Sequence, residues 1–318
     1  METFFVMLKN VVIFVLLAVP GFLMVKSKLL RSSDSGILSK LLTQIGVPAL
    51  ILSNTIGLKF TGSLTKGLIV ISILSVLFYL FMYATSAWLC KGEKDRNRRA
   101  MTRFCIIFSN SGFIGIPLAM AVFPGNAEIL AYVAVSNIVM NVVMFILGAY
   151  LISGDKNVIQ IKTALLSPVL LAFFAGLVLN LLGVAKVVPE IDVFAGHLKG
   201  IVTPLSMFVI GMKLADVSPK QMFGDRRLYY VSFLRLIAYP VIGMTAALLL
   251  RQAPALGITA NGVLGFFIGF SMPVAGLSSV FADRYNGDGE SAVVYTLGTT
   301  IFSVLTISTI YWILMLVL

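Results

Sequence analysis

Long apolar runs, separated by short polar connections, are the feature that most constrains the fold of this 318-residue chain. About ten of these runs are long enough to cross roughly 30 Å of hydrocarbon as a helix. We place them at residues 4–24, 37–58, 65–90, 101–123, 128–152, 162–183, 197–215, 227–250, 261–282 and 290–317. Strands of a membrane barrel would be about ten residues long and would alternate in polarity. The sequence therefore predicts an all-α membrane protein with ten transmembrane helices.

The distribution of charge gives the expected orientation. Only 12% of the residues are charged, although the net charge is +11. The basic residues cluster in short loops beside apolar runs, as in residues 91–99 (KGEKDRNRR), which is typical of topology determinants and not of a nucleic-acid-binding surface. Most of the 24 Lys and Arg residues lie inside if both termini lie outside. We expect a multi-pass protein of the cell inner membrane with both termini periplasmic or extracellular, and no nucleic-acid partner.

Residues that could support catalysis or a cofactor are scarce. Cys90 and Cys105 have no CxxC partner, and His197 is the one histidine. The chain has no phosphate-binding GxxxxGK[ST] motif and no GxSxG motif. We therefore expect no enzyme activity, no bound metal and no cofactor.

An internal repeat is indicated by three features that recur at nearly one spacing. They are Pro48 with Pro204, Pro117 with Pro273, both 156 residues apart, and the IGxK pattern of residues 56–59 with that of residues 210–213. A repeat of five spans is odd in number, so the second copy must enter the membrane inverted relative to the first. The expected organisation is one five-helix repeat at residues 1–155 and a second, inverted repeat at residues 156–318.

Two spans carry helix-breaking residues at their centres. Span 4 contains Gly112, Gly115 and Pro117, and span 9 contains Ser271 and Pro273. Proline removes a backbone donor and glycine lowers helix stability by about 1 kcal/mol. Each residue alone is also common at kinks and close helix contacts. Because the disruption occurs in both repeats, we predict that helices 4 and 9 are broken and cross at a substrate site.

The chemistry of the site is inferred from the polar residues near the breaks. No Asp or Glu falls at mid-span in the ten expected helices, which favours an anionic substrate held by neutral donors and helix dipoles. Arg235, within span 8, is either a counter-charge for that anion or a side chain that reaches back to the surface. Asn137 and Asn141 share one helix face and have a second interpretation as interhelical hydrogen-bond formers. The candidate substrate-binding residues are Ser53, Asn54, Asn110, Ser111, Gly112, Gly115, Pro117, Asn137, Asn141, Arg235, Ser271 and Pro273.

The same residues carry a family resemblance. Asn110, Gly115 and Pro117 match an N-x-x-x-x-G-x-P pattern, and Pro273 is followed by VFADRY at residues 280–285. This combination resembles the auxin efflux carrier family. Because only residues 153–161 separate spans 5 and 6, the chain is similar to compact bacterial members. The second crossover has Ser271 and Met272 before the proline and no asparagine, unlike the plant pattern.

The resemblance implies a mechanism as well as a fold. Spans 1, 2, 6 and 7 would form a scaffold, and spans 3–5 and 8–10 a moving transport unit with substrate at the Pro117/Pro273 crossing. The expected function is a secondary transporter that moves a small carboxylate, such as malate, malonate or an auxin-like acid, by alternating access. A sodium-coupled symporter with crossed helices and a membrane channel or sensor remain as alternatives. Membrane lipid is an expected partner, whereas a homodimer and coupling to protons or sodium are left open.

Overall fold

The computed structural model describes residues 2–159, 162, 166–184, 190–216 and 218–318, and in that part of the chain it contains helices and no named β-strand. Seven helical segments are long and apolar enough to cross a membrane: Met7–Lys26, Ser32–Ile56, Gly62–Leu89, Ala127–Ser153, Val193–Leu214, Arg226–Arg251 and Gly289–Val317. Three shorter apolar helices occupy other expected spans, at Ser111–Val122, Pro168–Leu181 and Ala260–Ser271. Residues 163–165, near the start of the expected sixth span, lie outside the described residues. The prediction of an all-helical membrane protein is confirmed, with seven candidate membrane spans among the described residues.

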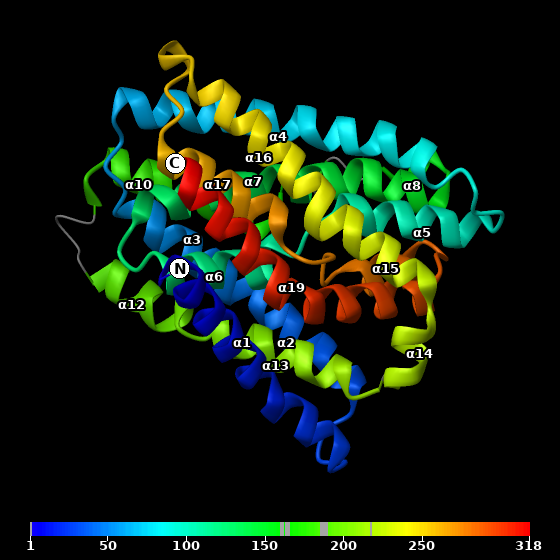
Figure 1. Cartoon of the computed structure of the whole chain (residues 1–318). Coiled ribbons are helices and arrows are strands. Elements are labelled where there is room, and N and C mark those ends of the chain that lie inside the picture. The colour runs from blue at the N-terminus through cyan, green and yellow to red at the C-terminus, as the bar shows by residue number, and fades with distance from the viewer. Residues whose placement is uncertain (1, 160–161, 163–165, 185–189, 217) are drawn as a thin grey trace.

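Figure 1 shows how the helices are arranged along the chain. Their bounds are α1 (Glu2–Lys26), α2 (Ser35–Leu41), α3 (Val47–Ile56), α4 (Gly62–Leu89), α5 (Arg96–Ile107), α6 (Ile116–Val122), α7 (Ala127–Val143), α8 (Ala149–Ser153), α10 (Pro168–Leu181), α12 (Glu190–Lys199), α13 (Val202–Leu214), α14 (Pro219–Gly224), α15 (Arg226–Phe233), α16 (Tyr239–Arg251), α17 (Ala260–Ser271), α18 (Ser278–Arg284) and α19 (Gly289–Val317).

Widened π turns precede three of the prolines. The π segments Leu42–Gly46, Ser111–Gly115 and Leu234–Ala238 end two residues before Pro48, Pro117 and Pro240, respectively. Proline has no N–H group and its ring clashes with the carbonyl four residues earlier, so a locally wider turn lets the helix continue. As a result α2 runs into α3 and α15 into α16 without an interruption of the span.

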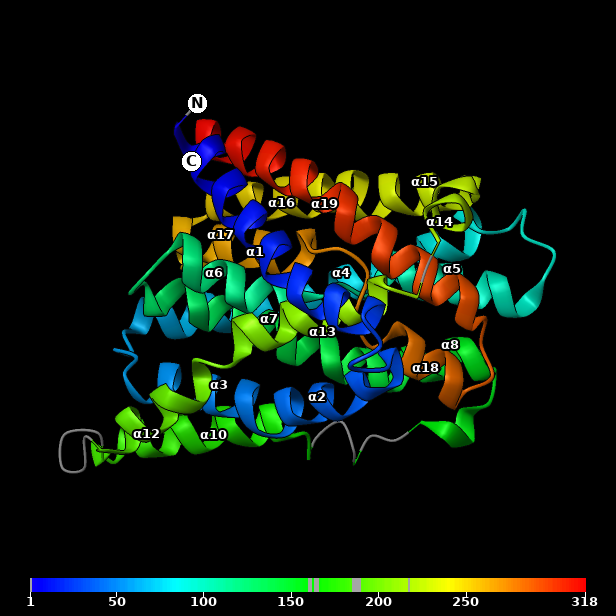
Figure 2. The same ribbon diagram turned by 90° about the horizontal axis from the view of Figure 1, so that it is seen from below.

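The helices pack in two sets, which meet where α1 also packs against α19. In one set α1 packs against α13, and α3 packs against α10 and α12. In the other, α7 packs against α4 and α17, α16 against α17, and α15 against α19. Figures 1 and 2 place both termini at the same end of the bundle and the connection between α4 and α5 at the opposite end.

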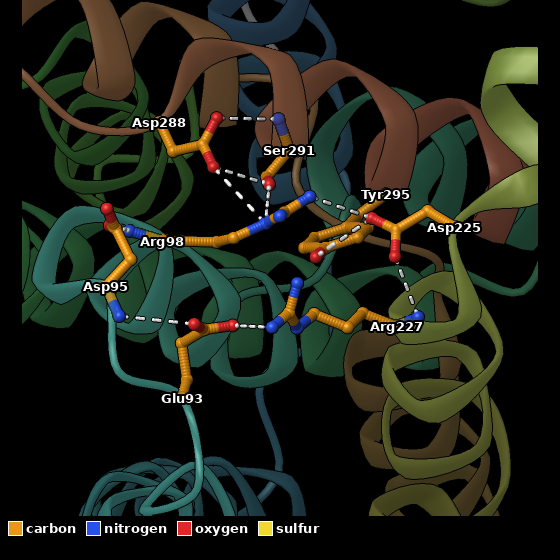
Figure 3. A network of polar contacts seen from close by, with 8 residues as sticks. All are labelled: Glu93, Asp95, Arg98, Asp225, Arg227, Asp288, Ser291 and Tyr295. Carbon is orange, nitrogen blue, oxygen red and sulfur yellow. Dashed lines mark hydrogen bonds and ion pairs between the residues drawn. The ribbon is translucent and has the colours of Figure 1, made fainter.

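At that opposite end, an aspartate precedes the first residue of each of three helices, α5, α15 and α19. The side chains of Asp95, Asp225 and Asp288 accept hydrogen bonds from the first-turn amides of α5, α15 and α19. Such caps satisfy amides that have no partner within the helix. Arg98 lies 3.3 Å from Asp225 and 3.6 Å from Asp288, so one guanidinium joins the starts of α15 and α19 to α5 (Figure 3).

A second ion pair extends this network. Arg227, at the start of α15, lies 2.5 Å from Glu93 in the connection between α4 and α5. The Arg98 side chain is 36% exposed, and a single pair at that exposure contributes little to stability. The several charges act as a network, and they hold helices from both halves of the chain together.

Candidate functional site

The two segments that carry the central glycines and prolines meet in the structure. Helix α5 ends at Ile107 and the next helical segment begins at Ser111, while residues 272–277 separate α17 from α18. Ser109 and Val274 form an antiparallel β-bridge. We call residues 108–110 together with residues 272–277 the crossing.

Backbone hydrogen bonds hold the crossing together. The Asn110 amide donates to the Pro273 carbonyl at 2.7 Å, and the Ala275 amide donates to the Phe108 carbonyl at 3.0 Å. Non-helical backbone is tolerated at membrane depth only where its polar groups find partners inside the protein. The two segments supply these partners to each other.

Pro117 does not lie at the crossing, which corrects the expectation that the Pro117/Pro273 pair marks it. The bridged residues Ser109 and Val274 are 165 residues apart, whereas Pro117 and Pro273 are 156 apart. Pro117 is buried inside α6, where the preceding π segment accommodates it. Pro273 does lie at the crossing.

The backbone amides that follow the two prolines are also already used. Pro117 is followed by helical residues of α6, and the Val274 amide donates to the Thr299 hydroxyl at 3.1 Å. The Ala275 amide takes part in the crossing itself. The Val274 and Ala275 amides are therefore not free to bind a ligand in this geometry.

A cavity with several polar side chains in a largely apolar wall lies beside the crossing. Its empty volume is about 430 Å³. Its lining residues come from the crossing, from helices α3, α7 and α10, and from the π segments before α3, before α6 and after α7. They are Thr43, Val47, Ser109, Asn110, Gly112, Phe113, Asn137, Met140, Asn141, Met144, Val169, Ala275, Gly276 and Leu277. The cavity thus lies between the two packing sets of helices.

A wider cavity of about 1250 Å³ adjoins the first one. Thr43, Asn141, Val169 and Leu277 line both. The wider cavity also reaches Lys162, in the connection between α8 and α10. The cavity beside the crossing therefore opens toward that connection.

Asn110 has the most unusual environment of the lining residues. It is only 3% exposed, and its Nδ2 atom has no hydrogen-bond partner in the described part of the chain. An unsatisfied buried donor costs about 1–3 kcal/mol. An acceptor oxygen of a bound molecule in the cavity would remove that cost.

Asn137 and Asn141 line the cavity and are also held by hydrogen bonds. Asn137 Nδ2 donates to the Ser111 hydroxyl at 2.9 Å, which joins α7 to the π segment before α6. Asn141 Nδ2 donates to the backbone carbonyl of Asn137 at 2.8 Å and to its Oδ1 at 3.1 Å. Ser111 is not a lining residue, and it positions Asn137. A Cβ atom on Gly112 would lie 3.1 Å from Asn137 Nδ2, so glycine permits this approach.

Four other candidates lie away from the cavity wall. Ser271, at the end of α17, is fully buried, and its hydroxyl has no partner among the described residues. A Cβ atom on Gly115 would meet Met272 at 3.1 Å, so Gly115 is a packing residue. Ser53 and Asn54 line a different cavity of about 800 Å³ with Lys199, whose Nζ donates to the Ser53 hydroxyl at 2.9 Å. The structure does not bring Ser53 and Asn54 together with Asn110.

Arg235 neither lines the cavity nor reaches the surface. Its side chain is fully buried, and Nε donates to the Met272 carbonyl at 3.2 Å. Nη1 donates to the carbonyls of Ile106 and Ile107 at 3.1 and 2.9 Å, and Nη2 donates to that of Phe270. The guanidinium therefore binds the carboxyl-terminal ends of both α5 and α17.

Two residues near the site were not among the sequence candidates. Gly276 lines the cavity, and a Cβ atom there would lie 3.0 Å from Phe113 and 3.3 Å from Asn110 Nδ2. Lys213 Nζ donates to the Gly276 carbonyl at 3.3 Å. Lys213 belongs to the repeated IGxK pattern and Gly276 to the small-residue stretch of span 9, so the sequence carried a signal for both.

Comparisons with known proteins agree with this architecture. The model of the family described as "Membrane transport protein" matches residues 5–311. A protein of Methanothermobacter thermautotrophicus named "Uncharacterized transporter" is 23% identical over 302 residues, which cover 94% of each chain. Members of this family are transporters and not enzymes. The chain is a multi-pass membrane protein and belongs to the membrane transport protein family, which is the auxin efflux carrier family that its motifs resemble.

Proposed function

We propose that this protein is a secondary transporter that moves a small organic anion across the inner membrane by alternating access. The observation that carries the proposal is the buried, unpartnered Nδ2 of Asn110 on the wall of the cavity beside the crossing. A buried donor without a partner in a cavity wall is suited to a carboxylate oxygen of a small ligand.

The polarity of the cavity supports an anion over a cation. Its lining, all from the described residues, contains amides, hydroxyls and apolar groups but no Asp or Glu. Gly112 and Phe113 lie in the first turn of the helical segment Ser111–Val122, where backbone N–H groups lack intrahelical partners and the helix dipole is positive. Neutral donors and a positive helix end both favour a carboxylate.

The proposed architecture has ten spans in two inverted five-helix repeats, residues 1–155 and 156–318. Spans 4 and 9 are the broken helices, and reciprocal backbone hydrogen bonds join their interrupted segments at the crossing. The packing sets support a scaffold of spans 1, 2, 6 and 7 and a transport unit of spans 3–5 and 8–10. Both termini lie outside in this arrangement, with the basic connection between α4 and α5 inside.

Ligand-induced thermal stabilisation of the purified protein tests this proposal. We expect at least one member of a panel of small mono- and dicarboxylates to raise the unfolding temperature in a saturable manner, because a ligand that binds the folded state stabilises it. Uncharged amides and primary amines of the same size serve as matched controls. Stabilisation by the amines alone, or by none of the carboxylates, would contradict the anion assignment.

A further inference from the structure

A fully buried arginine within a membrane-spanning helical segment requires compensation for its charge. The Arg235 guanidinium cannot be deprotonated under ordinary conditions, and a buried charge without partners is strongly unfavourable. None of the ion pairs found among the described residues includes Arg235. Its hydrogen-bond partners are the backbone carbonyls of Ile106, Ile107, Phe270 and Met272.

These carbonyls supply the compensation. A helix that ends leaves its last carbonyls without intrahelical partners, and its carboxyl-terminal end carries roughly half a negative charge. Helices α5 and α17 end beside each other at the crossing, at Ile107 and Ser271. Two such ends together match about one positive charge, which is the charge of a single guanidinium.

In transporters with interrupted helices, carbonyls at half-helix ends coordinate a coupling cation. We propose that Arg235 is a resident cation that occupies the carbonyl cluster at the ends of α5 and α17, so that no coupling sodium ion binds there. Given the proposed function, anion transport through this site then requires no sodium at the crossing.

The geometry leaves a sodium ion neither ligands nor a favourable potential. All four carbonyl oxygens accept hydrogen bonds from the guanidinium. A second cation would also meet the fixed charge of Arg235 in a medium of low dielectric constant, where repulsion is weakly screened.

The position of Arg235 also affects the cavity. Ile107 precedes the first segment of the crossing, and Met272 begins the second, so the guanidinium is bonded directly beside residues that line the cavity. Arg235 is therefore a positioning residue that fixes both segments without a direct contact to the contents of the cavity.

Thermal unfolding in matched salts tests the resident cation without any substrate. We expect wild-type protein to unfold at the same temperature in sodium chloride and in choline chloride at equal ionic strength. Arg235→Ala is expected to unfold at a lower temperature, and guanidinium at low millimolar concentration or sodium should restore part of the loss by occupying the vacated carbonyls. Arg251→Ala, at the end of the same helical segment Arg226–Arg251, should show neither response.

Two outcomes would overturn the proposal. One is a sodium-specific stabilisation of the wild type. The other is a folded Arg235→Ala protein that responds to neither guanidinium nor sodium. If Arg235→Ala cannot be purified, Arg235→Lys tests the proposal instead, because it keeps a cation at the carbonyls. Its unfolding temperature should be the same in sodium chloride and in choline chloride. A sodium response of Arg235→Lys would overturn the proposal. None of these readouts contains a carboxylate, so failure of the proposed function would leave them unchanged.

Discussion

Replacement of Asn110 by alanine is expected to remove most of the stabilisation that a carboxylate gives to the protein. A hydrogen bond to a charged group contributes about 1.5–3 kcal/mol, so affinity should fall roughly 10- to 100-fold. The ligand-free protein should not unfold at a lower temperature, because Asn110 Nδ2 has no partner to lose within the described structure and alanine removes an unsatisfied buried donor. Thermal unfolding with and without the carboxylate measures both effects.

Asn180→Ala is the matched control for this prediction. Asn180 Nδ2 donates to the carbonyls of Thr55, Ile56 and Leu58 at 3.2, 2.5 and 2.8 Å, where it caps the end of α3 away from the cavity. Its removal should lower the unfolding temperature and leave the ligand-induced increase intact. An Asn110→Ala protein that is destabilised without ligand yet keeps wild-type affinity would show that Asn110 is structural and not a ligand donor.

Replacement of Gly211 by valine is expected to cause the largest loss of stability. A Cβ atom at Gly211 would clash with the Ala18 carbonyl oxygen, and one at Gly21 would clash with that of Phe208. Helices α1 and α13 thus approach each other through glycines on both sides, as is usual for close helix pairs in membranes. Overpacking typically lowers the free energy of unfolding by about 1–3 kcal/mol. Because the new side chain would clash with backbone, we expect Gly211→Val to lose about 3 kcal/mol, the upper end of that range.

Unfolding in detergent by heat or denaturant measures this loss. Gly57→Ala is the control, because Gly57 occupies the equivalent place in the repeated IGxK pattern, and the nearest atom to its Cβ position is 3.9 Å away. We expect Gly57→Ala to remain within about 0.5 kcal/mol of the wild type, as substitutions without a steric conflict do. Equal stabilities for Gly211→Val and the wild type would contradict the close α1–α13 contact.

The hydrophobic pattern predicted most of the fold, since long apolar runs determine where a chain crosses the hydrocarbon. The expected spans at 65–90, 128–152 and 290–317 correspond to helical segments Gly62–Leu89, Ala127–Ser153 and Gly289–Val317. The sequence also singled out Asn110, Asn137 and Asn141, which the structure brings to one cavity.

The site residues that the sequence placed differently from the structure depend on contacts between distant parts of the chain. Pro117 breaks no helix because a π turn accommodates it, and composition alone does not distinguish a widened turn from a break. The partners of Arg235 are carbonyls more than 30 residues away along the chain, which no local pattern identifies. Ser53 and Asn54 have suitable chemistry, but helix packing places them at a separate cavity.

Counterflow in proteoliposomes tests the central claim most directly. Vesicles containing the purified protein are loaded with an unlabelled carboxylate that stabilises it, and the labelled acid is added outside. A transporter that exposes one site to each side in turn should accumulate label transiently above equilibrium, with saturation at high acid concentration. Uptake that equilibrates without overshoot or saturation, or no uptake at all, would contradict alternating access to the cavity beside the crossing.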